Sequence, residues 1–168
     1  MSTERTIILS HSEIARKIER MAYEIYENNY LQEELVLIGI RERGTELANR
    51  LAIFLKSISS LQITSFTVNL NVGSPTEEEL RLNRQPELLD GKTVILVDDV
   101  CNSGRTLCYA IKPLLEHLPK KIEIATLVNR EHKSFPIRAD YIGLSLATTL
   151  QEHIHVEFGK KDQAFLQS

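Results

Sequence analysis

Apolar and polar residues follow two different periods along this chain, and the pattern predicts an α/β fold. Between residues 12 and 28 the apolar side chains recur at helical spacing, which indicates a helix with one buried face. Further helices are expected after residue 44 and from residue 104 to 118. The short apolar runs that are typical of strands cover residues 6–9, 34–40, 62–70, 94–97, 122–128 and 153–158. Because strands and helices alternate through the middle of the chain, we expect a doubly wound, mostly parallel sheet flanked by helices.

Two segments show no clear element. Residues 71–90 are polar, and we expect a long loop there with one helical turn near residues 77–82. The tail from residue 159 is also polar and predicts no regular structure. The sequence contains no internal repeat and no convincing linker, so residues 1–168 are expected to form a single domain.

Composition narrows the class of protein. The 168 residues carry a formal charge of −3, with 42% hydrophobic and 26% charged residues, as expected for a globular protein. The acidic balance argues against a broad nucleic-acid surface, and no DNA partner is expected. Two cysteines cannot form a disulfide framework, and neither a signal peptide nor a long apolar run is evident. We therefore expect a reduced, cytoplasmic protein without a membrane partner.

The stretch from residue 93 to 107 combines a buried strand, two acids, a small polar turn and the start of a helix. The apolar run 94–97 ends at Asp98 and Asp99, and the turn 101–104 leads into a helix that begins near Arg105. Backbone N–H groups of such a loop, at a helix N-terminus, are suited to bind a phosphate. Two carboxylates would repel that phosphate, so they are expected to face sugar hydroxyls or a magnesium ion. The stretch therefore predicts a cradle for a sugar that carries a 5′-phosphate.

Residues 94–106 resemble the phosphoribosyl-pyrophosphate (PRPP) signature of the type I phosphoribosyltransferases, with Ser103 where threonine is usual. The resemblance implies that family's fold, with a small hood, and transfer of 5-phosphoribose from PRPP to a nucleobase with release of pyrophosphate. It implies a catalytic set of Asp98, Asp99 and Arg43, in which the acids hold the ribose hydroxyls. The implied substrate-binding residues are Arg41, Glu42, Arg43 and Gly44 at the pyrophosphate, and Cys101, Asn102, Ser103, Gly104, Arg105 and Thr106 at the 5′-phosphate.

The resemblance also implies a cofactor and an assembly. Magnesium is expected to bind mainly through PRPP, with Asp98 and Asp99 as candidate ligands. Members of the family commonly form dimers or tetramers, so a homo-oligomer is expected.

Residues 127–143 are similar to the pyrimidine-operon attenuators, a branch of the family that joins RNA-binding regulation to uracil phosphoribosyltransferase activity. This similarity favours uracil as the base. It implies that Tyr141 stacks on the base and that the backbone of Ile142 and Gly143 reads the edge of the base. The residues alone equally allow an ordinary strand with a buried tyrosine.

Two departures from the family pattern bear on the choice of base. Asn102 stands where six-oxopurine enzymes carry an aspartate and where attenuators carry a tyrosine. An amide cannot take a proton near neutral pH, which argues against hypoxanthine, guanine or xanthine without excluding them. The closing loop lacks the attenuators' Arg-Asp pair, and its cations are Arg81 and Arg84. Uracil transfer therefore depends on whether this altered loop supports turnover.

Two other functions remain open. Arg20, His132, Lys133 and Arg138 retain part of the basic set that the attenuators use to bind RNA, but Glu19 and Glu131 place negative charge among them. RNA attenuation is therefore ranked below enzyme activity. A sensor that binds PRPP or a nucleotide without turnover would use the same loops and release no pyrophosphate.

Overall fold

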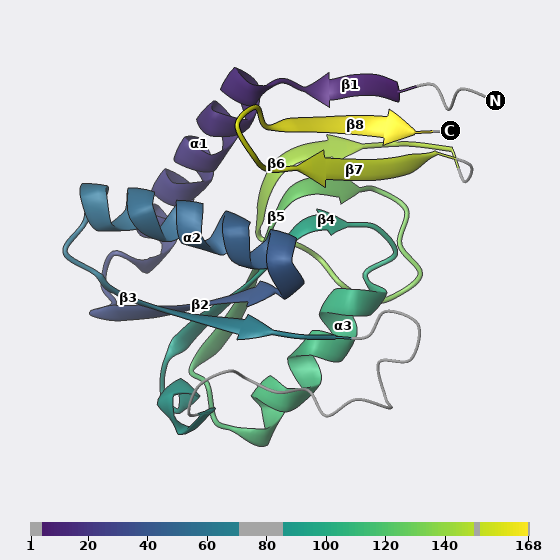
Figure 1. Cartoon of the computed structure of the whole chain (residues 1–168). Coiled ribbons are helices and arrows are strands. Elements are labelled where there is room, and N and C mark those ends of the chain that lie inside the picture. Colours follow the sequence, from purple (N-terminus) through teal and green to yellow (C-terminus); the bar gives the residue numbers. More distant parts are fainter. Residues whose placement is uncertain (1–4, 71–85, 150–151, 168) are drawn as a thin grey trace.

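The computed structural model describes residues 5–70, 86–149 and 152–167 of the chain and contains two β-sheets (Figure 1). The larger sheet is parallel and has five strands. In spatial order these are β3 (Gln62–Val68), β2 (Glu34–Ile40), β4 (Thr93–Cys101), β5 (Lys121–Arg130) and β6 (Tyr141–Leu146). The smaller sheet is antiparallel, in the order β1 (Arg5–Leu9), β8 (Gln163–Gln167), β7 (His153–Glu157).

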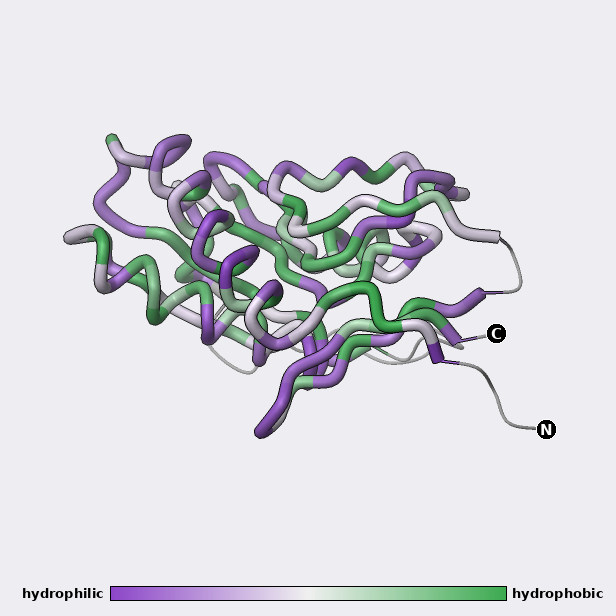
Figure 2. The backbone as a smooth tube through the Cα atoms, turned by 90° about the horizontal axis from the view of Figure 1, so that it is seen from above, coloured by the Kyte–Doolittle hydropathy of each residue, from purple (hydrophilic) through white to green (hydrophobic). Residues whose placement is uncertain are grey.

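Helices cover both faces of the larger sheet. Helices α1 (His11–Asn29) and α2 (Arg41–Ile58) pack on one face, and α3 (Arg105–Ile111) packs on the other. Short 3₁₀ helices, η1 (Pro86–Leu89) and η2 (Lys112–Glu116), accompany α3. The expected doubly wound architecture is confirmed for the described part of the chain. Figure 2 shows hydrophilic and hydrophobic positions alternating along the helices, as is usual where one face of each helix is buried.

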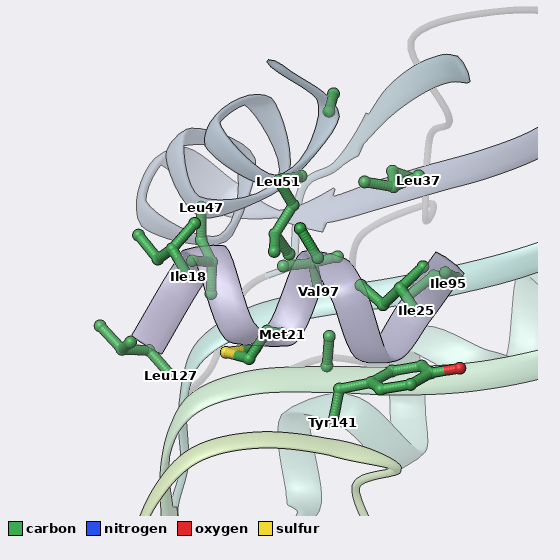
Figure 3. Packing of buried hydrophobic residues seen from close by; sticks show 14 of the residues in the cluster. Ile18, Met21, Ile25, Leu37, Leu47, Leu51, Ile95, Val97, Leu127 and Tyr141 are labelled. Atoms are coloured by element: carbon green, nitrogen blue, oxygen red, sulfur yellow. The ribbon is translucent and has the colours of Figure 1, made fainter. Parts of the chain in front are cut away.

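The strands of the larger sheet contribute to two separate cores because their side chains alternate between the faces. In β4, Ile95 and Val97 join the core under α1 and α2, whereas Val94 and Leu96 join the core under α3. This explains why the run 94–97 is apolar at every position. Figure 3 shows the first core, where Ile18, Met21 and Ile25 of α1 meet Leu47 and Leu51 of α2 above the strands.

The order of the strands creates a crevice at one end of the sheet. The chain leaves β2 through α2 to reach β3 on one side, and β4 lies on the other side of β2. In such sheets, ligands bind beyond the carboxyl ends of the two strands where the order reverses. Gly39 of β2 lies opposite Val97 of β4, so Arg41, which directly follows β2, lies at the level of Asp98 and Asp99 in β4. This register brings two distant sequence segments to one site.

Three expectations about secondary structure were wrong. The tail is not irregular, because β8 forms the middle strand of the antiparallel sheet and buries Ala164 and Phe165. The helix expected over residues 104–118 is α-helical only to Ile111, because Pro113 lacks an N–H and its ring hinders a further α-turn. Residues 41–44 do not form a loop before the second helix, since α2 begins directly at Arg41. The turn expected at 77–82 lies outside the described residues.

Candidate active site

A cavity of about 280 Å³ lies at the carboxyl ends of β2 and β4 and gathers most of the residues expected at the PRPP site. Its lining residues are Arg41, Arg43, Asp98, Asp99, Val100, Cys101, Asn102, Ser103, Gly104, Arg105, Thr106, Leu107, Ile154 and His155. Glu42 lies beside this cavity, in an adjoining pocket that also contains Arg43 and both aspartates. The sequence signature and the segment after β2 therefore meet in space.

Gly44 allows α2 to pack closely against β4 beside the two aspartates. A Cβ atom at this position would lie 2.6 Å from the carbonyl oxygen of Val97 and 3.3 Å from the Cα atom of Asp98. Because real Cβ atoms do not approach a backbone so closely, the first turn of α2 can pass over β4 only without a side chain here. Gly44 thus acts through close packing and does not line the cavity.

Two buried acids form the floor of the cavity. Asp98 is 3% exposed and Asp99 is 9% exposed. The backbone N–H of Asp99 donates to Oδ1 of Asp98 at 3.0 Å. Burial, and then the neighbouring charge of Asp99, raise the pKa of Asp98 well above its usual range, while Arg41 acts in the opposite direction. The pair therefore gains from hydrogen-bond donors or a cation that a ligand brings to it.

Two arginines lie across from the acids, at the start of α2. Arg43 Nη1 is 4.0 Å from Asp99 Oδ2, and its side chain remains largely exposed. Arg41 has a backbone φ of 52°, which is the left-handed region that non-glycine residues rarely adopt. The expected pyrophosphate loop is thus replaced by a sharp entry into the helix, with strain of about 1–3 kcal/mol at Arg41. Such strain is typical of functional sites. The sharp turn at Arg41 leads to a helix start at which both Arg41 and Arg43 line the cavity.

The phosphate loop is fixed from outside by the connection between β5 and β6. The carbonyl oxygen of Ser103 accepts hydrogen bonds from the backbone N–H groups of Ser134 and Phe135, at 3.0 and 3.1 Å. Gly104 has a φ of 83° and lies so near Ile137 that a Cβ would be 3.1 Å from its side chain. Residues 134–137 therefore brace the phosphate loop. Cys101, inside it, is buried, and burial raises the pKa of its thiol, which favours the less reactive protonated form.

Tyr141 does not lie at the cavity. Its side chain is 1% exposed and packs in the core beside α1 (Figure 3). Its hydroxyl donates to Glu123 Oε2 at 3.0 Å and accepts from Asn29 Nδ2 at 3.2 Å. Tyr141 pairs with Ala125, whereas the carboxyl end of β5 is at Arg130, about 16 Å further along the strand. The position fits the alternative of a buried strand tyrosine and places no stacking platform at the cavity.

The edge formed by Ile142 and Gly143 is also occupied. Arg20 Nη2 donates to both carbonyl oxygens at 2.9 Å, and Nη1 of the same residue pairs with Glu24. Because β6 is the outer strand of the sheet, Arg20 satisfies acceptors on an open edge. The expected base-reading role of Ile142 is therefore not supported by its placement.

Of the candidate RNA-binding residues, His132 and Arg138 are exposed, and Lys133 donates to the carbonyl oxygen of Arg130 at 3.0 Å. Arg20 lies on α1, and its partly exposed guanidinium already contacts Glu24 and β6. The described residues thus contain only part of a basic surface that could receive RNA.

Residues on the smaller sheet complete the cavity and were missed by the sequence. Ile154 and His155 of β7 line the wall that faces the phosphate loop. The His155 ring stacks on Phe165 of β8, with 5.4 Å between the ring centroids. Arg130 at the end of β5 contacts Asn102 of the loop. The alternation at 153–158 predicted the strand, but only the antiparallel pairing brings it over the site.

No cluster of three or more metal-ligating side chains occurs among the described residues. In the same part of the chain, no helix is long and apolar enough to span a membrane.

Comparison with known proteins identifies the family. The phosphoribosyl transferase domain model matches residues 4–163. The chain is 38% identical over 155 residues to the bifunctional protein PyrR of Enterococcus faecalis, covering 89% of this chain and 87% of the relative. It is 37% identical over 170 residues to the PyrR of Pelotomaculum thermopropionicum, covering 96% and 93%.

Solved structures agree with the fold. A hypoxanthine-guanine phosphoribosyltransferase from Bacillus anthracis superposes with a TM-score of 0.71 at 21% identity, covering 88% of this chain and 85% of that one. The hypoxanthine phosphoribosyltransferase of Trypanosoma cruzi superposes with a TM-score of 0.73 at 16% identity, covering 89% and 84%. The chain therefore belongs to the phosphoribosyl transferase family, as a PyrR-like member with the type I fold, and it is a pentosyltransferase.

Proposed function

We propose that this enzyme transfers the 5-phosphoribosyl group of PRPP to uracil. In this reaction the bond from C1 of the ribose to pyrophosphate breaks, and a bond from C1 to the base nitrogen forms. The observation that carries the proposal is the buried pair Asp98 and Asp99, which lies between the phosphate loop and the two arginines of α2. This arrangement offers acceptors in the centre and anion-binding groups on both sides, as a sugar with two phosphate ends requires.

Each group has a separate role in the proposal. The backbone of residues 101–106 binds the 5′-phosphate, and Asp98 and Asp99 accept hydrogen bonds from the ribose hydroxyls. Arg41 and Arg43 stabilise the charge on the leaving pyrophosphate. The transition state is expected to resemble an oxocarbenium ion, so the enzyme needs positioning and electrostatic stabilisation rather than a covalent nucleophile.

Magnesium fits this site as a companion of the substrate. Buried carboxylates with a raised pKa, as at Asp98, are stabilised by a nearby cation. Asp98 and Asp99 are the candidate protein ligands, and the remaining ligands would come from PRPP and water, as is usual for Mg²⁺. When bound, the ion would supply charge to the departing pyrophosphate.

Uracil is favoured over six-oxopurines for two reasons. The relatives named above are PyrR proteins at 37–38% identity, whereas the purine-specific structures share only the fold. Asn102 lines the cavity at the place where a purine enzyme needs an aspartate, and its amide cannot exchange a proton near neutral pH.

The proposal extends to compartment and assembly. A cytoplasmic location is supported by the two free cysteines, Cys101 and Cys108, which fit a reducing environment. A homo-oligomer stays a prediction from the family. RNA attenuation and ligand sensing without turnover stay the alternatives, and the engagement of Arg20 with β6 lowers the weight of the first.

The deciding experiment is pyrophosphate release from PRPP and magnesium, with uracil, hypoxanthine, guanine and xanthine supplied one at a time. We expect release with uracil. Release with a purine alone would overturn the assignment of the base. If PRPP binds and none of the four bases yields pyrophosphate, the transferase activity is absent under these conditions and sensing or regulation becomes the better account.

Replacing Arg43 by alanine should raise the Kd for PRPP about tenfold, because one charge-assisted contact to the pyrophosphate is lost. Uridine monophosphate carries no pyrophosphate, so its Kd should change by less than about twofold. Titration calorimetry with both ligands measures the difference. Arg16→Ala, which removes an exposed arginine from α1, is the matched control. Equal weakening of both ligands by Arg43→Ala would remove Arg43 from the pyrophosphate site.

A further inference from the structure

Arg130 links two segments that border the cavity. It is the last residue of β5, and its Nη1 donates to Oδ1 of Asn102 in the phosphate loop at 2.8 Å. Its Nη2 donates to the carbonyl oxygen of Thr149, which follows β6. Asn102 belongs to the lining of the cavity and Arg130 does not. The guanidinium therefore contacts the phosphate loop from outside the cavity.

This contact fixes the orientation of the Asn102 amide. A guanidinium has five N–H donors and no acceptor, so the atom of Asn102 that faces it must be the carbonyl oxygen. The NH₂ group of the amide then points away from Arg130. Within the described part of the chain, no hydrogen bond engages this Nδ2 atom. The Asn102 side chain consequently turns its NH₂ donor away from Arg130.

Arg130 is itself held in place by its neighbours. Lys133 Nζ donates to the carbonyl oxygen of Arg130 at 3.0 Å. Thr149 is fixed by Glu152, whose carboxylate accepts from the backbone N–H and the hydroxyl of Thr149, both at 2.9 Å. Asn102 is exposed and would otherwise rotate freely. The orientation of its amide is thus set by a chain of contacts that begins in the segment after β6.

We propose that Arg130 is a positioning residue that holds Asn102 as a fixed hydrogen-bond donor toward the nucleobase. The site then selects a base that presents a carbonyl oxygen at this point, and no proton is exchanged there. The inference rests on the proposed function and adds a specificity determinant to it. Uracil has two carbonyl oxygens that only accept hydrogen bonds, so it satisfies such a donor. A base that presents an amino group at the same position would place two donors together and leave both unsatisfied.

The two thio analogues of uracil test this inference, because sulfur is a weaker acceptor than oxygen. The measurement is kcat/KM for uracil, 2-thiouracil and 4-thiouracil at saturating PRPP. It is made for the wild type, Arg130→Met, Asn102→Ala and the double variant. Arg16→Met is the matched control for loss of an exposed arginine, and thermal melting confirms that each variant is folded.

The expected result is a coupled loss of discrimination. The wild type and Arg16→Met should disfavour one of the two thio analogues by about tenfold, as one hydrogen bond would give. Both single variants should reduce this ratio to about twofold, and the double variant should be no worse than Asn102→Ala. The KM for PRPP should stay within about twofold in Arg16→Met and Arg130→Met.

Each result that would contradict the inference overturns a different part of it. Wild-type discrimination in Arg130→Met, or independent effects that multiply in the double variant, would overturn the positioning role while leaving the transferase intact. Equal use of both thio analogues by the wild type would overturn recognition of a carbonyl oxygen. A wild type that converts none of the three pyrimidines would remove the proposed function, and this inference with it.

Discussion

Replacing Asp98 by asparagine will remove nearly all transfer activity and will make the protein more stable at neutral pH. The activity falls by about 100-fold or more, because a charged acceptor for the ribose and the developing positive charge is lost. Asparagine keeps the volume of the side chain and the Oδ1 atom that accepts the Asp99 N–H. The variant therefore removes the charge while the local geometry stays the same.

The gain in stability follows from the sign of the pKa shift. Burial and Asp99 raise the pKa of Asp98 in the folded state, so the ionised side chain opposes folding once the pH exceeds its unfolded value of about 4. Removing that charge should therefore raise both the free energy of unfolding and Tm at pH 7.5. The gain should vanish below pH 4, where unfolded and folded Asp98 are both protonated.

Thermal melts at pH 7.5 and pH 3.5, together with pyrophosphate release, check both parts. Asp90→Asn serves as the control, since Asp90 is exposed and its Oδ1 accepts from the backbone N–H of Leu118, a contact that asparagine can keep. A lower Tm for Asp98→Asn at pH 7.5 would contradict the electrostatic argument. Retained turnover would remove Asp98 from the ribose site.

Replacing Asp162 by asparagine will destabilise the protein and weaken the wall of the cavity. Asp162 is 2% exposed and lies in the turn between β7 and β8. Its carboxylate accepts from Arg50 Nη1 at 2.5 Å and Nη2 at 3.1 Å, and from the Gly159 N–H at 3.0 Å. Without its charge, Arg50 keeps only the partly exposed Glu46 as an ionic partner among the described residues. We expect a loss of about 2 kcal/mol, below the usual range for buried pairs because Arg50 is partly exposed.

The pH dependence has the opposite sign from that of Asp98. Burial alone would raise the pKa of Asp162, but hydrogen bonds from Arg50 and Gly159 outweigh it and lower the pKa. The stabilisation is therefore present above the unfolded value of about 4 and is lost as the pH falls through the lower folded value.

Thermal melts of Asp162→Asn across this range should show a deficit at pH 7 that shrinks in acid. Glu157→Gln, which weakens an exposed pair with Arg5 at 3.8 Å, should change Tm by less than about 2 °C. An unchanged Tm for Asp162→Asn would mean that the turn is held by other contacts. KM should also rise in Asp162→Asn, since β7 carries Ile154 and His155 at the cavity.

The parts of the fold that depend on local pattern were predictable from the sequence. Continuous apolar runs identified the buried parallel strands, and helical spacing identified the face of α1 that packs on the sheet. The strand β8 was missed because it is short, and of its two partners only β7 is nearby in the chain, whereas β1 lies near residue 5. Pairing between such distant segments leaves little trace in the local pattern.

The candidate site also has one part that the sequence predicted and another part that it did not. The acids and the phosphate loop are contiguous in sequence, so one motif predicted them together. The stacking role of Tyr141 came from the resemblance, whereas the residues alone equally allowed a buried strand tyrosine, and local pattern does not reveal the level of the sheet at which a residue lies. Arg130 and His155 reach the site through tertiary contacts, which no spacing in the sequence encodes.

The pairing of β1 with β8 determines when the site becomes complete during synthesis. The five strands of the parallel sheet lie within residues 34–146, so the acid pair and the phosphate loop are synthesised before β7 and β8. Strand β1 leaves the ribosome first but waits for residues 163–167 before it pairs. The wall formed by β7 is fixed at that same late moment. A chain that stops short of β8 would display two unpaired strand edges, which makes it a target for aggregation and proteolysis.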